Sequence, residues 1–197
     1  MGKNLLAVVF LPALLFGQST PAPAGSSVDP LSVGKKFEYR MVSAFGPTKI
    51  ITVAVIAGYD QLTNTPSEWK QGAEGYGKRY ASQFGTNVAR QTFAFGLEAA
   101  LHEDPRYFPS GEKGFGKRFK SVLKQAILTR TDSGRDRFAV GRIGSAMGAA
   151  WLANTWQPRS TDTAGNAMST FGLTIAGDAG YNFLQEFFPI FRPKELR

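Results

Sequence analysis

Small residues spaced four positions apart place the strongest constraint on how this chain folds. Within stretches of helical periodicity, glycine or alanine recurs at every fourth position. An interior glycine costs a helix about 1 kcal/mol relative to alanine, so its retention indicates that a neighbouring backbone approaches closely. We therefore expect an all-α fold, a compact bundle of about four to five glycine-rich helices. The positions concerned are Gly85 and Ala89, Gly96 and Ala100, Gly144 and Gly148, and Gly172, Ala176 and Gly180.

The same glycines are compatible with two other structures. Small residues at helical spacing also line helix contacts inside membranes, and glycine-rich segments of about ten residues build outer-membrane β-barrels. We favour tight packing in a soluble bundle over embedded helices because charged residues such as Arg90, Glu98 and Asp178 fall inside the helical stretches. Helix caps and i, i+4 spacings favour helices over strands. An outer-membrane β-barrel is the alternative fold.

The first residues have the form of an export signal. Lys3 precedes an apolar run over residues 5–16, which is too short for a spanning helix of about 20 residues, and Ala22-Pro23-Ala24 resembles a cleavage site. We expect residues 1–24 to be a signal peptide and the protein to be periplasmic or envelope-associated. Residues 25–46 are expected to be a flexible or extended arm, residues 47–191 a single helical domain, and residues 192–197 a C-terminal tail.

Local signals indicate where individual elements begin and end. Thr65-Pro66-Ser67-Glu68 resembles a capping box and predicts a helix that begins near Pro66 and is interrupted or bent by Gly72, Gly75 and Gly77. Alternation over residues 37–42 favours a short strand or extended arm, and residues 49–59 fit either a buried strand or a buried helix. Four further helices are expected near residues 78–103, 116–131, 138–156 and 163–188, with a loop at 132–136.

A nine-residue glycine motif occurs at residues 72–80 and again at residues 111–119. Both copies satisfy G-x-x-x-x-G-K, but arginine follows where a phosphate-binding loop needs Ser or Thr to hold magnesium, so we exclude nucleotide hydrolysis. Backbone amides of a glycine turn and a Lys-Arg pair suit a phosphate or carboxylate, and the alternative is a helix-start turn with solvated charges. The predicted anion- or partner-binding residues are Gly75, Gly77, Lys78, Arg79, Gly114, Gly116, Lys117 and Arg118.

The second copy opens a basic amphipathic segment. One helical face carries Phe115, Phe119, Val122, Leu123, Ala126 and Ile127, and much of the remainder carries Lys117, Arg118, Lys120, Lys124 and Arg130. Such a helix either lies on an anionic membrane surface or packs its apolar face on its own core, and both alternatives stay open. The net charge of +8 favours anionic lipid or an envelope polymer as partner, and export argues against nucleic acid. The sequence is also consistent with a homo-oligomer.

One histidine supplies the only basis for an enzymatic alternative. His102 follows Glu98 by one helical turn, and Asp104 adds a second carboxylate, so these three residues are the candidate catalytic set of a hydrolase. His102 is equally explained by the dipole at a helix C-terminus. A lone histidine makes a poor zinc site, and the chain has no cysteine, so we expect neither a metal nor a cofactor.

Several short blocks together resemble a group of uncharacterised exported bacterial proteins. They are N-T-P-S-E-W (64–69), G-A-E-G-Y-G-K-R-Y (72–80), H-E-D-P-R-Y-F (102–108), T-R-T-D-S-G-R (129–135), N-T-W-Q-P (154–158) and Q-E-F-F-P (185–189). The likeness spans residues 45–191 and implies a single exported domain without implying a reaction. We therefore expect a non-enzymatic binding or structural role at the envelope, toward an anionic surface or partner, with the hydrolase as the alternative.

Overall fold

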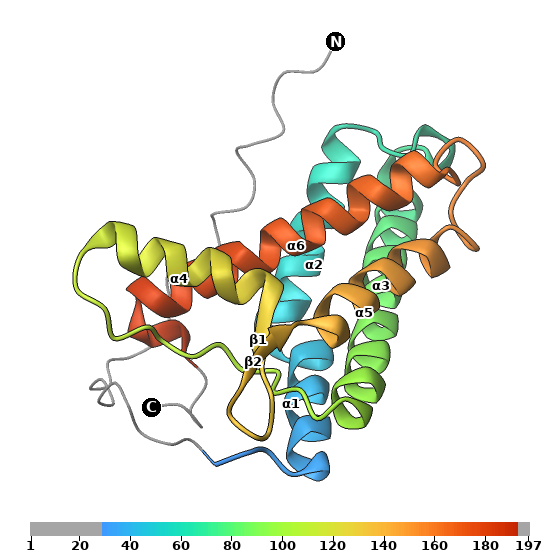
Figure 1. The fold of residues 1–197 in the computed structure, drawn as a ribbon. Coiled ribbons are helices and arrows are strands. Elements are labelled where there is room, and N and C mark those ends of the chain that lie inside the picture. Colours follow the sequence, from blue (N-terminus) through green and yellow to red (C-terminus); the bar gives the residue numbers. More distant parts are fainter. Residues whose placement is uncertain (1–28, 193–197) are drawn as a thin grey trace.

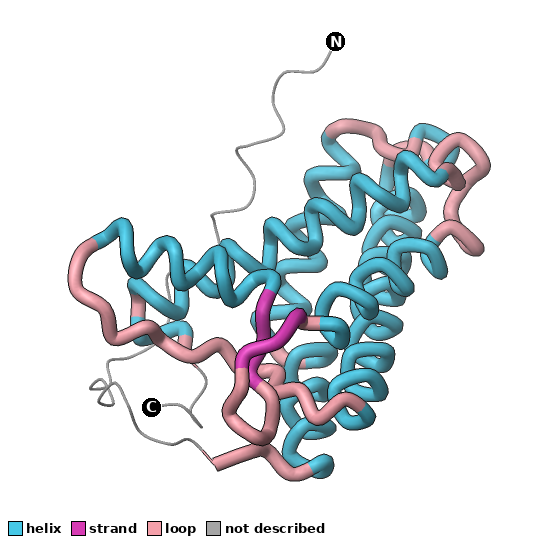
Figure 2. Tube along the Cα trace, in the orientation of Figure 1, coloured by secondary structure: helices cyan, strands magenta, loops and turns pink. Residues whose placement is uncertain are grey.

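The computed structural model describes residues 29–192, and helices make up most of it (Figures 1 and 2). The helices are α1 (Val33–Phe45), α2 (Pro47–Leu62), α3 (Gly72–Ala100), α4 (Phe115–Ile127), α5 (Val140–Ala153) and α6 (Ala164–Phe187), with short 3-10 helices η1 (Ser67–Trp69) and η2 (Pro189–Phe191). Strands β1 (Leu128–Arg130) and β2 (Asp136–Phe138) pair antiparallel between α4 and α5. The predicted all-α fold is confirmed. The expected signal peptide lies outside the described residues.

Helix α3 is the centre of the bundle. Helices α1 and α2 run end to end along it, and α5 packs on it as well (Figure 1). Helix α6 packs instead on α5 and α4. Gly46 separates α1 from α2, and a Cβ atom there would lie 2.5 Å from the Val42 carbonyl oxygen. Pro47, at the first helical position, then starts α2.

The N-terminal part of the chain differs from the prediction in two places. Residues 37–42 belong to helix α1 and do not form a strand or extended arm. The alternation was misleading because Lys36 and Arg40, one helical turn apart, are both buried. Residues 49–59 belong to α2, but the expected burial is wrong for Ile50, Ile51 and Val55, which are exposed.

The helix expected at Pro66 begins at Gly72 instead. The Thr65 hydroxyl donates to the Thr63 carbonyl oxygen, and residues 67–69 form η1. Gly72, with φ +90°, is the entry to α3, and the later glycines of the motif do not interrupt the helix. A Cβ atom on Gly75 would lie 2.4 Å from the Lys70 carbonyl oxygen, so this glycine lets the preceding loop fold back onto the helix.

Close glycine packing occurs at the contact between α3 and α5. A Cβ atom added at Gly144 would lie 3.2 Å from the Leu97 side chain, and one added at Gly148 would lie 3.3 Å from the Phe93 ring. The prediction is confirmed for these two glycines. The prediction is wrong for Gly96, Gly172 and Gly180, where an added Cβ would meet nothing within 4 Å. Gly96 lines a cavity with Gly144 and Gly148 and does not touch α5 directly, so among these positions the expected close contact is made by the glycines of α5.

The interior of the described chain is built from small and polar residues. Its buried apolar residues are ten alanines, Val53, Val122 and Tyr107. The largest side chains with almost no exposure include five charged ones, Arg79, Lys36, Glu98, Glu103 and Glu186. Large apolar side chains lie mostly on the outside, as described below. Small and charged side chains are thus buried and large apolar ones exposed, whereas an ordinary soluble protein buries its large apolar side chains.

Candidate functional site

The three candidate catalytic residues do not converge. The Glu98 carboxylate is buried and accepts from the Arg40 guanidinium, with Nε 2.7 Å from Oε2 and a second bond from Nη2 to Oε1. The Asp104 carboxylate is buried and accepts from Arg106, with Nη2 2.6 Å from Oδ2. Each carboxylate is thus neutralised by its own arginine and is unavailable as a partner for His102.

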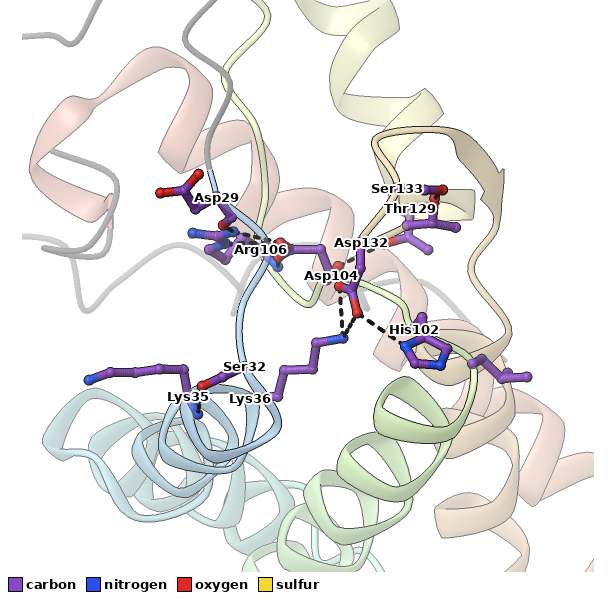
Figure 3. A network of polar contacts seen from close by, with 12 residues as sticks. Asp29, Ser32, Lys35, Lys36, His102, Asp104, Arg106, Thr129, Asp132 and Ser133 are labelled. Carbon is purple, nitrogen blue, oxygen red and sulfur yellow. Dashed lines mark hydrogen bonds and ion pairs between the residues drawn. The ribbon is translucent and has the colours of Figure 1, made fainter.

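His102 contacts Asp132, and Figure 3 shows this pair in the polar network that also contains Asp104 and Arg106. The His102 side chain is 79% exposed, and its Nδ1 lies 3.5 Å from Oδ2 of Asp132, in the hairpin loop. The same carboxylate binds the buried Lys36 ammonium at 2.8 Å, and the Asp132 amide donates to the His102 carbonyl oxygen. These contacts therefore tie α1 to the hairpin.

Sequence reasoning missed Glu103, which lies between two of the candidate residues. Its carboxylate accepts the Gly141 amide at 2.8 Å and the Val140 amide at 3.1 Å, so it caps the first turn of α5. Burial raises the pKa of Glu103 above its usual range, and the two backbone hydrogen bonds oppose this shift. No local signal marks this role, because the helix that it caps begins far along the chain.

In the first glycine motif, arginine and lysine point to different environments. Arg79 is fully buried, and its guanidinium uses five hydrogen bonds to hold residues 61–70. Lys78 is exposed and pairs with Glu74 at 2.6 Å. Gly75 is buried beneath the same loop, while Gly77 faces open space. Of the Lys-Arg pair in this copy, only Lys78 presents its charge to the outside.

The second motif repeats that division with a different backbone. Gly114, at φ +91°, precedes α4, whereas its counterpart in the first copy is helical. Arg118 Nε donates to Glu186 at 2.9 Å, and its guanidinium lies 4.2 Å from the centre of the Phe187 ring. Lys117 and Gly116 are exposed. In both copies the arginine is held internally and the lysine faces outward, so the anion-binding prediction now rests on the two lysines.

Glu186 joins the second motif to the loop before it. Besides Arg118, its carboxylate accepts from the Tyr107 hydroxyl at 2.7 Å and from the Ser110 hydroxyl at 2.6 Å. Burial and the hydrogen bond to Glu186 raise the pKa of Tyr107 above its usual range. The sequence analysis did not identify Glu186, because 68 residues separate it from Arg118 along the chain.

Helix α4 presents an exposed apolar ridge, which we define as Phe115, Phe119, Leu123 and Ile127. Their exposed fractions are 63%, 39%, 47% and 50%. Exposed lysines follow along one side of the ridge, at positions 117, 120 and 124. Only Val122 and Ala126 of the predicted apolar face are buried. The helix therefore combines both alternatives of the sequence analysis, with a narrow buried face and a broader apolar face in contact with solvent.

The ridge continues onto α6 through aromatic contacts. Phe115 and Phe119 stack with ring centres 5.8 Å apart, and Phe115 also contacts Phe187 at 5.3 Å. Phe183 and Phe187 of α6 lie 4.5 Å apart. These ring contacts hold the ridge in place, so the apolar surface is part of the folded structure.

Comparison of the chain with protein-family models, with curated proteins and with solved structures finds no match.

Proposed function

We propose that this protein is exported and acts at the cell envelope in a non-enzymatic binding or structural role, with α4 binding an anionic membrane surface. The observation that supports this most directly is the exposed α4 ridge with its row of lysines. A helix with a solvent-facing apolar stripe beside cationic side chains inserts the stripe at the headgroup boundary of a membrane. The lysines then remain at the level of the headgroups.

The charges around α4 favour an anionic surface. Lys117 lies 3.9 Å from Glu112, and Lys124 lies 2.6 Å from Asp136. Both pairs are exposed, and exposed pairs contribute only about 0–1 kcal/mol, so these lysines are readily redirected to lipid phosphates. Each lysine near an anionic bilayer contributes about 1 kcal/mol to binding. Lys113 and Arg130, just beyond either end of the helix, are also exposed and add to the positive electrostatic potential around α4.

The hydrolase alternative has less support from the geometry. It requires Glu98, His102 and Asp104 to act on one substrate, but two of them are buried in separate arginine pairs. His102 contacts Asp132 instead. We therefore retain the binding role as the proposed function.

Co-sedimentation with lipid vesicles tests the proposal. The protein is mixed with vesicles of phosphatidylcholine alone and with vesicles that also contain phosphatidylglycerol, and the ratio of the two affinities is measured. The variant Lys117→Glu, Lys120→Glu, Lys124→Glu should lower this ratio at least ten-fold, because three attractive charges become repulsive. The matched control reverses three exposed basic residues away from α4, at Lys35, Lys70 and Arg159. An unchanged ratio in the α4 variant, or an equal loss in the control, would contradict the role assigned to α4.

A further inference from the structure

Large exposed apolar side chains occur on all six α-helices of the described chain. Examples are Phe37 on α1, Ile51 on α2, Phe93 on α3, Trp151 on α5 and Leu173 on α6, in addition to the α4 ridge. A partner protein covers one face of a molecule, whereas these side chains belong to helices throughout the bundle (Figure 1). A lipid bilayer, in contrast, surrounds an embedded protein and contacts helices on many of its sides.

The segment Val33–Leu62, formed by α1 and α2, is long and apolar enough to cross a membrane. Only 17% of its most apolar window is buried, so most of its apolar side chains do not face the core of the bundle. It is also not a separate leader, because Lys36 and Arg40 are bonded to Asp132 and Glu98 of the domain. Between residues 41 and 59 the only charged residue is Lys49. Gly46 divides those 19 residues between the end of α1 and α2. Laid end to end, the two pieces of helix reach at most about 28 Å, close to the hydrocarbon thickness of about 30 Å.

The charged residues that favoured a soluble bundle in the sequence are paired in the structure, where Glu98 is buried and Arg90 and Asp178 are partly buried. From α3, Glu98 binds Arg40, and Arg90 binds Asp178 of α6. Arg40 also donates to Gln91, and Asn87 donates to the Ala44 carbonyl oxygen, so a polar ladder runs between α1 and α3. Intramembrane charges in proteins face the bundle interior and pair with one another, as they do here.

Small residues form the helix contacts of the bundle. Alanines of α5 are buried together with Gly141, while Trp151 and Leu152 of the same helix are exposed. In lipid, small residues at helix interfaces permit close backbone approach, and large apolar residues face the acyl chains. Close α3–α5 packing and exposed bulky side chains are therefore both expected for helices surrounded by lipid.

We infer that the bundle is embedded in a bilayer, with the α1–α2 segment lying along α3 and facing lipid acyl chains. The inference rests on the proposed function for membrane contact and deepens it from surface binding to insertion. The α4 ridge and its lysines then lie at the headgroup level of the same membrane. The interior ion pairs remain shielded from lipid by the helices that carry them.

Extraction of the full chain from membranes tests embedding. Membranes are washed with high salt, then alkaline carbonate, then a mild detergent, and the retained protein is floated on a density gradient to separate it from aggregates. We expect the protein to resist salt and carbonate, to float with lipid and to be released by detergent. Release by salt or carbonate would overturn embedding and leave the anionic-surface proposal standing. Protein that pellets without floating is self-associated, and this outcome would overturn embedding as well.

Two variants test whether the exposed face of α2 contacts lipid or water. Ile51→Lys with Val55→Lys places two charges on exposed positions of α2, which is nearly neutral in water but strongly unfavourable among acyl chains. We expect the carbonate-resistant fraction to fall at least ten-fold, while circular dichroism in detergent shows the helices intact. Ser67→Lys, in the exposed η1, should leave that fraction unchanged. Full carbonate resistance in the α2 variant would overturn the assignment of this face to lipid.

Discussion

Arg40 of α1 and Glu98 of α3 form a buried two-point ion pair on the central helix of the bundle. Arg40 Nε lies 2.7 Å from Glu98 Oε2, and Nη2 binds the other carboxylate oxygen. Its remaining Nη1 donates to Gln91 at 2.9 Å, so the guanidinium spans two turns of α3. The pair fixes α1 on α3, and the two charges compensate one another where neither is solvated.

Removing one partner of this pair should be far more damaging than removing both. Glu98→Ala leaves the Arg40 guanidinium buried without its counter-charge, so we expect the free energy of unfolding to fall by about 3–5 kcal/mol. The double variant Arg40→Met, Glu98→Leu replaces the charges with apolar groups of similar volume and should recover most of that loss. Denaturant unfolding of the purified variants measures both values. A double variant as unstable as Glu98→Ala would contradict this account of the pair.

Arg79 should be irreplaceable by lysine, although the two residues carry the same charge. Its guanidinium donates to the carbonyl oxygens of Thr65, Pro66 and Lys70, and to two side-chain oxygens of the same loop. An ammonium group has three donors at one point and does not reach this set of acceptors. Arg79→Lys should therefore lower the free energy of unfolding by about 2–4 kcal/mol and expose residues 61–70 to proteolysis.

The neighbouring Lys78 provides the control for Arg79. Its side chain is half exposed and forms an ion pair with Glu74 one turn away. Lys78→Arg should change the free energy of unfolding by less than about 0.5 kcal/mol and leave the rate of loop cleavage unaltered. Equal effects at the two positions would show that Arg79 does not hold the loop.

The helices could be predicted from sequence where caps and breakers lie next to them. Pro189 follows the end of α6, as proline should. Thr163 caps α6 by accepting the Asn166 amide, although the sequence predicts Thr161 or Asp162 as the cap. The later helices near residues 138–156 and 163–188 were accordingly placed within a few residues of α5 and α6. Local chemistry determined these boundaries, so local reasoning was sufficient.

The buried face could not be predicted, because hydrophobic periodicity assumes that apolar residues point inward. In α3 the buried side chains include Arg79, Asn87, Gln91 and Glu98, which such a pattern assigns to solvent. In α2 most of the apolar β-branched residues that suggested a core element are exposed, and only Val53 is buried. The candidate catalytic set failed for a related reason. The partners of Glu98 and His102 come from α1 and the hairpin loop, far away in the sequence.

Two glycine-to-alanine substitutions should have opposite effects on stability. At Gly141 an added Cβ would lie 2.5 Å from Glu98 Cγ and 2.8 Å from Glu103 Oε2, so α5 would have to move away from α3. We expect Gly141→Ala to lower the free energy of unfolding by about 1–3 kcal/mol. At Gly172 an added Cβ meets nothing within 4 Å, and the residue is inside α6. Gly172→Ala should raise stability by about 0.5–1 kcal/mol through helix propensity, measured by the same unfolding experiment. The same sign for both variants would contradict the packing seen at α5.

The stability of the fold should decrease in alkaline solution because of Tyr107. Its pKa is raised by burial and by the hydrogen bond to Glu186, so the folded chain keeps the phenol proton where the unfolded chain releases it. The stabilisation is present in full below a pH of about 10 and is lost as pH rises above it, by about 1.4 kcal/mol per pH unit. Tyr107→Phe should remove this part of the slope, as measured by unfolding at a series of alkaline pH values. Ser110→Ala is the control, because it removes another donor to Glu186 without removing a titrating group. Its stability loss should be independent of pH, and a slope retained in Tyr107→Phe would exclude Tyr107 as the cause.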